Sequence, residues 1–207
     1  LEPQMQLQAI GQMLDNHDRP KLVGLVRMLA KGDSARQIAD QIRQTVASGY
    51  GTFRATAAQA WDQLPIPPAP SEKVVESALL ALLQNPILTK AGVPHKGAFT
   101  GTQKLHLAAS IGDWEGVIEH GIYGRLAEET PTYYGGEINK SLLTALEVLA
   151  ERAAAELLPI RRNQTLASYE VLEAYDQEYT GLVRRRRALA FQDVSYYLSR
   201  WMQTSNV

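Results

Sequence analysis

The chain has 207 residues, of which 45% are hydrophobic and 21% charged, with a formal net charge of −1. These values are ordinary for a soluble globular domain, and they leave only a local electrostatic argument for nucleic-acid binding. The lack of cysteine excludes disulfides and thiolate metal sites, and no apolar run approaches the roughly 20 residues that span a bilayer. We therefore expect a cytoplasmic protein without membrane contact. The sequence starts at Leu1 and stops shortly after a helical stretch at Trp201, so we expect a piece of a longer protein.

Residues 1–64 form an N-terminal helical segment. Apolar residues recur there at intervals of three and four, and proline, glycine and short polar residues mark where helices begin and end. The predicted helices are Gln4–Leu14, one from Pro20 to Gly32, one from Asp33 or Ser34 to Gly49, and Phe53–Leu64.

Residues 65–70 read Pro-Ile-Pro-Pro-Ala-Pro and predict a stiff, extended connector. The connector separates residues 1–64 from a second helical segment, residues 71–207. We expect the two segments to form one domain.

The second segment is also helical, apart from irregular stretches at Asn85–Thr102 and around Pro131–Gly136. A short pair of strands is an alternative to an irregular structure in the second of these stretches. Pro159 is expected to kink or divide the long helical region near the C-terminus. No stretch between turn signals alternates apolar and polar residues over six or more positions, so the prediction is an all-α, irregular multi-helix domain with a long C-terminal helical hairpin. The predicted helices are Ser71–Leu83, Gln103–Ser110, Trp114–His120, Lys140–Leu158, Arg161–Arg186 and Phe191–Met202.

Two leucine and tyrosine stripes are expected to form that hairpin. One stripe runs from Leu142 to Leu157, and the other runs from Leu166 to Leu182 through Tyr169, Tyr175 and Tyr179. Each is a narrow apolar face of the kind that one helix lays along another.

No catalytic constellation is present in the sequence. It has no Gly-x4-Gly-Lys-Ser/Thr loop to cradle phosphates, and its four histidines are scattered without metal-ligand spacing. We therefore expect no catalytic residue, metal or cofactor in this chain. Thr102–Val117 resembles an ankyrin repeat, but no second copy lies 33 residues away, so it predicts only a pair of helices.

Arg184, Arg185, Arg186 and Arg187 are the densest charge in the chain. Their ordinary interpretation is a solvated helix end, where cations favour the C-terminal dipole. The functional interpretation is contact with DNA phosphates, which depends on salt and not on sequence. Arg161 and Arg162 are further candidates. Tyr133 and Tyr134 either stack on bases or anchor their own loop.

The stretch after the arginines, Leu189-Ala190-Phe191-Gln192-Asp193-Val194, resembles UvrD-like superfamily 1 DNA helicases, most closely the RecB and AddA helicase-nucleases. In that family a tyrosine-bearing helix leads through a basic segment into Leu-x-Phe-Asp-Asp. Gln192 replaces the first of the two acidic residues here. The resemblance implies that Phe191 and Asp193 have structural roles and orient the following helix.

The resemblance further implies a helical 1B-like insertion of the N-terminal motor domain. The parent would use ATP and magnesium to unwind DNA in repair or recombination, whereas this fragment would lack an ATPase site and contact duplex DNA weakly. Its partners would be DNA, the remaining motor domains and a nuclease subunit. The alternative is a helical protein-interaction module, in which an exposed leucine or tyrosine stripe receives a partner helix.

Overall fold

The computed structural model describes residues 2–16, 24, 35–189 and 191–205. Within these residues the protein is mostly helical, with one pair of two-residue strands, which confirms the all-α class. The helix predicted from Pro20 to Gly32 falls outside the described residues, Gly24 excepted. None of the helices in the described part combines the length and apolar character needed to cross a membrane.

The chain divides into two compact units. Unit 1 contains residues 1–64 and 161–207, and unit 2 contains residues 65–160. One division falls where the proline-rich connector begins, and the other falls just after Pro159. The predicted segment 71–207 is therefore shared between the two units.

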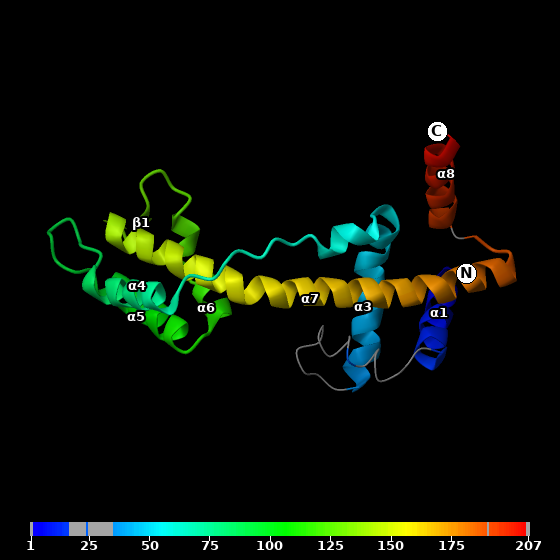
Figure 1. The fold of residues 1–207 in the computed structure, drawn as a ribbon, viewed down its shortest axis with the longest axis horizontal. Helices are drawn as coiled ribbons and strands as arrows, with labels where there is room; N and C mark the ends of the chain where they lie inside the picture. The colour runs from blue at the N-terminus through cyan, green and yellow to red at the C-terminus, as the bar shows by residue number, and fades with distance from the viewer. Residues whose placement is uncertain (1, 17–23, 25–34, 190, 206–207) are drawn as a thin grey trace. The chain divides into compact units, whose positions relative to one another are not determined.

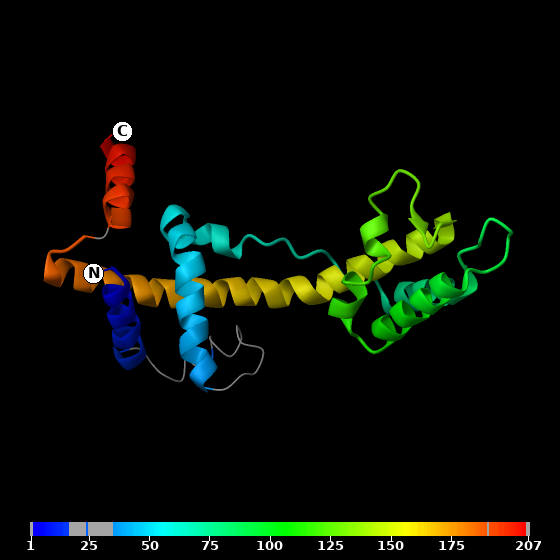
Figure 2. The same cartoon turned by 180° about the vertical axis from the view of Figure 1, so that it is seen from behind.

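In unit 1, helices α1 and α3 cross the C-terminal part of α7, as both views of the chain show (Figures 1 and 2). A core of large apolar side chains lies between these helices, and Tyr175 is the bulkiest of its fully buried members. The elements are α1 (Glu2–Asn16), α3 (Ala35–Ala55), the 3-10 helix η1 (Ala58–Asp62), α7 (Lys140–Arg186) from residue 161 onward, and α8 (Phe191–Ser205).

Helix α3 does not end at Gly49, as the sequence predicted, but continues to Ala55. A Cβ atom on Gly49 would lie 3.0 Å from Cδ1 of Leu172, so the glycine gives α7 room for a close approach rather than a stop. The next turn of α3 carries Tyr50 and Phe53 against the same core, which stabilises the continuation. The predicted helix Phe53–Leu64 is consequently wrong: its first residues belong to α3, and only η1 follows.

In unit 2, α4 and α5 lie beside the N-terminal part of α7 (Figures 1 and 2). A second core, with Leu82, Leu105, Leu142 and Leu146 fully buried, fills the space between the helices. The elements are α4 (Glu72–Gln84), α5 (Lys96–Ser110), α6 (Trp114–Ile118), the 3-10 helix η2 (Tyr123–Arg125), β1 (Thr132–Tyr133), β2 (Gly136–Glu137) and α7 up to residue 160.

Helix α5 begins at Lys96, inside the stretch that the sequence assigned to a loop. His95 caps it, because its Nδ1 accepts a hydrogen bond from the backbone N–H of Ala98 at 3.2 Å. Gly97 and Gly101 looked like helix breakers. They are instead the points where the helix passes close to the rings of Tyr134 and Tyr133.

The short strand pair left open by the sequence is present. Strands β1 and β2 are antiparallel and pair Thr132 with Glu137 and Tyr133 with Gly136. The two turn residues have positive φ, 53° at Tyr134 and 75° at Gly135, as a tight hairpin turn requires. At Gly136 any Cβ atom would overlap the carbonyl oxygen of Leu88, so the hairpin packs backbone to backbone there.

The predicted C-terminal hairpin is absent, because α7 is one helix of 47 residues that runs through Pro159. Proline removes one backbone hydrogen bond and crowds the preceding turn, but it does not end this helix. The leucine stripe belongs to the core of unit 2, and the buried tyrosines Tyr175 and Tyr179 belong to the core of unit 1. The two stripes therefore do not pack on each other.

His120 makes the stability of unit 2 depend on pH. Burial lowers the pKa of its imidazole, and nearby Lys104 lowers it further, although a hydrogen bond with the backbone of Gly101 raises it. The Nδ1 atom accepts a hydrogen bond from the N–H of Ile122 at 3.4 Å, as only an unprotonated nitrogen does.

A folded-state pKa below the unfolded value means that the unfolded chain binds the proton more tightly. The contribution of His120 is therefore complete above about pH 6.5 and is lost as the pH falls below that value. We expect the free energy of unfolding of unit 2 to fall as the pH is lowered below about 6.5, by well under about 1.4 kcal/mol per pH unit because solvent screens this half-buried group. Urea unfolding followed by Trp114 fluorescence measures this, and His120→Gln should flatten the dependence. An identical slope in the variant would contradict the assignment.

Candidate nucleic-acid interface

The four candidate arginines lie where α7 ends. Arg184, Arg185 and Arg186 form its last turn, and Arg187 follows with a φ of 49°. The N–H of Arg187 donates to the carbonyl of Arg184 and the N–H of Ala188 donates to that of Val183, both at 3.3 Å. This is a Schellman motif, in which the left-handed position is usually glycine. All four side chains are exposed.

The arginine side chains keep their charge uncompensated. Arg185 donates to Oε1 of Gln12 at 3.1 Å, and Arg186 donates to Oε1 of Gln8, so both reach neutral amides on α1. Among the residues that the structure describes, none of the four arginines forms an ion pair with a carboxylate. The arginine segment, residues 184–187, is therefore a surface of four cations that an external anion can approach.

Arg161 and Arg162 do not join the arginine segment. Arg161 precedes Arg184 by 23 residues on the same helix, which is roughly 35 Å at the rise of an α-helix. Arg161 donates to Gln164 at 3.1 Å, and Arg162 forms an ion pair with Asp62 on η1 at 2.7 Å. The Asp62 carboxylate compensates the charge of Arg162, so this pair fastens η1 to α7.

Asp193 lies buried at the start of α8. Its Oδ1 receives a hydrogen bond from Arg54 at 2.6 Å, and its Oδ2 receives one from the hydroxyl of Tyr179 at 2.9 Å. The side chains of Arg54 and Asp193 are only 9% and 2% exposed. Asp193 thus joins α8 to both α3 and α7. The side chain of Phe191 lies outside the described part of the structure.

The guanidinium of Arg54 is held by aromatic rings as well as by Asp193. Its Cζ lies 3.7 Å from the centroid of the Tyr196 ring and 5.3 Å from that of Tyr50. Burial opposes its charge, but the hydrogen bond to Asp193 and the nearby tyrosine and aspartate oxygens raise the pKa of Arg54 above its ordinary value. The group therefore stays charged at any pH at which the protein folds.

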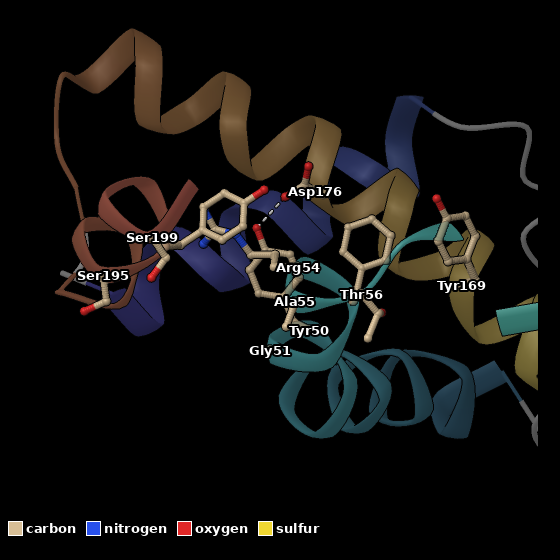
Figure 3. A pocket seen from close by; sticks show the side chains of 11 residues that line it. Tyr50, Gly51, Arg54, Ala55, Thr56, Tyr169, Asp176, Ser195 and Ser199 are labelled. Carbon is tan, nitrogen blue, oxygen red and sulfur yellow. Dashed lines mark hydrogen bonds between the residues drawn. The ribbon is translucent and has the colours of Figure 1, made fainter. Parts of the chain in front are cut away.

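A second, part-buried contact lies next to this one. The hydroxyl of Tyr50 donates to Oδ1 of Asp176 at 2.6 Å, and Figure 3 shows this bond between α3 and α7. Burial, and then the bond to Asp176, raise the pKa of Tyr50 well above its usual range, so the phenol remains protonated. The ring of Tyr50 meets that of Tyr175 edge to face, with centroids 4.9 Å apart.

The helices α3, α7 and α8 enclose an open cleft of about 710 Å³ within unit 1. Figure 3 shows Ser195 and Ser199 on α8 at one side of it and Tyr169 on α7 at the other. We call this the aromatic cleft, because the half-buried rings of Tyr50, Phe53, Tyr169 and Tyr196 line it. Its volume is in the range of pockets that take small molecules.

Sequence reasoning did not identify Arg54 or the aromatic cleft. Arg54 and Asp193 are 139 positions apart, and no spacing rule connects an arginine on one helix with an aspartate on another. One local signal existed: Tyr50, Phe53 and Arg54 lie at intervals that put them on one side of α3. That pattern predicts a cation beside aromatic rings, but not its carboxylate partner.

The tyrosines of the β-hairpin anchor their own loop. Tyr133 lies over Gly101, and the ring of Tyr134 stacks on His95 with centroids 5.3 Å apart. Tyr134 remains 58% exposed, yet one side of its ring is occupied by His95. The hairpin residues are therefore used chiefly to hold the hairpin against α5.

Arg187 occupies a backbone position that favours glycine, so Arg187→Gly is expected to stabilise unit 1 by about 1 kcal/mol. The gain comes from relief of the left-handed backbone strain at the end of α7. Removal of the arginine side chain costs little in return, because that side chain makes no hydrogen bond in the described structure. Chemical denaturation monitored by circular dichroism measures it. Gly124→Ala, at an open position in unit 2, serves as the control for a glycine exchange elsewhere. Loss of stability in Arg187→Gly would contradict the assignment.

Comparison of the chain with protein-family models, with curated proteins and with solved structures finds no match.

Proposed function

We propose that this chain is an accessory helical subdomain of an ATP-dependent DNA helicase of the UvrD and RecB type, and that it contacts duplex DNA through the arginine segment. The observation that carries the proposal is the set of four exposed arginines without a carboxylate partner among the described residues. Phosphate groups are the natural ligands of such a surface, because guanidinium binds them with two parallel hydrogen bonds.

The strained backbone at Arg187 supports a functional use of the charge. Glycine would satisfy the Schellman motif without strain, whereas an arginine in the left-handed region costs about 1 kcal/mol. Strain of this kind is common where the side chain has a task besides folding. The arginine adds a fourth cation at the position where the helix has already ended.

The surroundings of Asp193 support the family resemblance. The resemblance assigns an orienting role to the acidic residue before the next helix, and Asp193 holds α8 through Arg54 and Tyr179. In the parent, ATP and magnesium would bind in the flanking motor domains, and unwinding would take place on cytoplasmic DNA. This subdomain would position duplex DNA for them and carry no ATPase site.

The exposed apolar stripe of α8 supports contact with protein. Its members recur at intervals of three and four and are 40–66% exposed. In the proposal this stripe faces the rest of the parent motor. It also favours the second candidate, a protein-interaction module, for which the buried tyrosine stripe of α7 is no longer suitable. The residues of the α8 stripe are Val194, Tyr197, Leu198, Trp201 and Met202.

Titration of a fluorescent DNA duplex with the chain, at about 50 mM and about 200 mM salt, tests the proposal. Two to four phosphate contacts predict that affinity falls roughly ten- to a hundredfold between these concentrations. A protein interface that buries apolar surface would persist at the higher salt. Absence of DNA binding at the lower salt would leave the protein-interaction module as the better account.

A further inference from the structure

We propose that the aromatic cleft binds an unstacked base of single-stranded DNA, at a site separate from the arginine segment. Four half-buried rings line the cleft, although aromatic side chains usually bury their faces in a core. A flat guest that stacks on them would remove the remaining apolar surface from water. Proteins that bind single strands obtain their affinity in this way, by stacking bases on aromatic rings.

The charges of the cleft favour a neutral guest over a phosphate. The guanidinium of Arg54 is already compensated by Asp193 at 2.6 Å, so it has no charge left for an external anion. Asp176 adds a further carboxylate to the lining. A phosphate would therefore meet a net negative wall, whereas the base itself carries no charge.

The same geometry disfavours a cationic side chain as the guest. Arg54 lies 3.7 Å from the centroid of the Tyr196 ring and is itself the cation that this aromatic group holds. A second ammonium or guanidinium would face Arg54 and find that ring already occupied. A neutral base avoids this repulsion and can stack on the other rings of the cleft.

Hydrogen-bonding groups on two of the helices that line the cleft, α7 and α8, match a nucleotide. Only Oδ1 of Asp176 is bonded, to Tyr50, and its second oxygen has no partner among the described residues. A carboxylate oxygen is the acceptor that recognises the exocyclic amine of cytosine. On α8, Ser195 and Ser199 lie one turn apart, and within the described structure their hydroxyls are unbonded. These hydroxyls suit the sugar oxygens of the same nucleotide.

The first test compares two single-stranded probes, dC and dT homo-oligomers of twelve nucleotides, by fluorescence anisotropy with the full chain. Cytosine offers an amine where thymine has a carbonyl, so we expect tighter binding of the dC oligomer by about fivefold. Asp176→Asn offers an amide in place of the carboxylate and should abolish this preference. Glu151→Gln, an exposed carboxylate on the same helix that does not line the cleft, is the matched control and should keep it.

The second test fills the cleft. Ser195→Trp should weaken binding of the dC oligomer about tenfold, because the indole occupies the space of the base. Val194→Trp, the neighbouring exposed position on α8 outside the cleft lining, should bind as the parent does. Circular dichroism verifies that each variant is folded, and Asp176→Asn provides an independent result if Ser195→Trp is not.

Three outcomes would overturn the proposal. The first is equal binding of both oligomers, lost only when the arginine segment is replaced, which would mean contact through phosphates alone. The second is unchanged affinity in Ser195→Trp. The third is a shift of the Ser195 and Ser199 amide resonances by arginine amide but not by the oligomers, which would assign the cleft to a cationic side chain. Duplex binding does not depend on the cleft, so Ser195→Trp leaves the test of the proposed function intact.

Discussion

Replacement of Asp193 by alanine is expected to destabilise unit 1 by about 3–5 kcal/mol, more than any exposed ion pair contributes. The reason is that the variant leaves the guanidinium of Arg54 without its carboxylate partner. Its side chain is 9% exposed, and Asp193 is the carboxylate that compensates it. Removal of one member of a buried pair leaves an unpaired charge in a medium of low dielectric constant, which costs more than the pair itself contributes.

Urea unfolding of the full chain measures the effect of Asp193→Ala. Trp61 reports on unit 1 and Trp114 on unit 2, so each tryptophan is followed in a variant that has phenylalanine at the other positions. The transition of unit 1 should shift, and that of unit 2 should remain. Asp40→Ala breaks the exposed pair with Arg43 and should cost less than about 1 kcal/mol. A cost of this small size in Asp193→Ala would refute the role given to the buried pair.

Two tyrosines next to Asp193 provide a sharper comparison. Tyr179→Phe removes a hydroxyl that donates to Asp193, and should cost about 1–2 kcal/mol. Tyr175→Phe removes a buried hydroxyl that has no hydrogen-bond partner in the described structure, so it should be neutral or stabilising. A larger loss of stability in Tyr175→Phe than in Tyr179→Phe would mean that the hydrogen bond from Tyr179 to Asp193 does not stabilise unit 1.

The second large effect concerns DNA. Replacement of Arg184 and Arg187 together by glutamine should lower the affinity for duplex DNA roughly tenfold at about 50 mM salt, because two phosphate contacts are lost. Replacement of Arg185 and Arg186 should have a smaller effect. Their guanidinium groups already donate to Gln12 and Gln8, and these bonds must break or bend before a phosphate binds.

A charge-matched variant separates local contact from net charge. Arg43→Gln with Arg162→Gln removes two cations elsewhere in unit 1, where both are paired with aspartates. This variant should bind duplex DNA nearly as the parent does. An equal loss of DNA affinity in both double variants would show that only the net charge of the protein matters. The arginine segment would then not be a specific contact site for DNA.

The sequence predicted the helical class and most helix positions, because amphipathic spacing and proline punctuation act locally. It placed a helix end at Gly49 and assigned Gly97 and Gly101 to a loop. Their neighbours are a leucine and two tyrosines far along the chain, so nothing in the local pattern distinguishes a glycine that ends a helix from one that admits another element. The same limit explains α7: Pro159 predicted a kink or a division, and the helix continues through it because residues on both sides pack into a core.

The candidate site was predictable to a similar degree. The arginine segment is visible as a run of charge, and its position at a helix end follows from the stripe that precedes it. The contacts of Arg185 and Arg186 cannot be predicted from the sequence, because their partners Gln12 and Gln8 lie about 175 positions away. Arg162 looked equivalent to the others, yet Asp62 compensates it. The difference between a free and a paired arginine depends on tertiary structure alone.

The most direct test of the account is the salt dependence of duplex binding, measured for the parent chain and for the variant with all four residues 184–187 replaced by glutamine. A plot of log affinity against log salt should have a slope between about −1.8 and −3.6 for the parent, corresponding to two to four phosphates, and a slope near zero for the variant. Equal slopes for the two proteins would show that the arginine segment does not contact DNA.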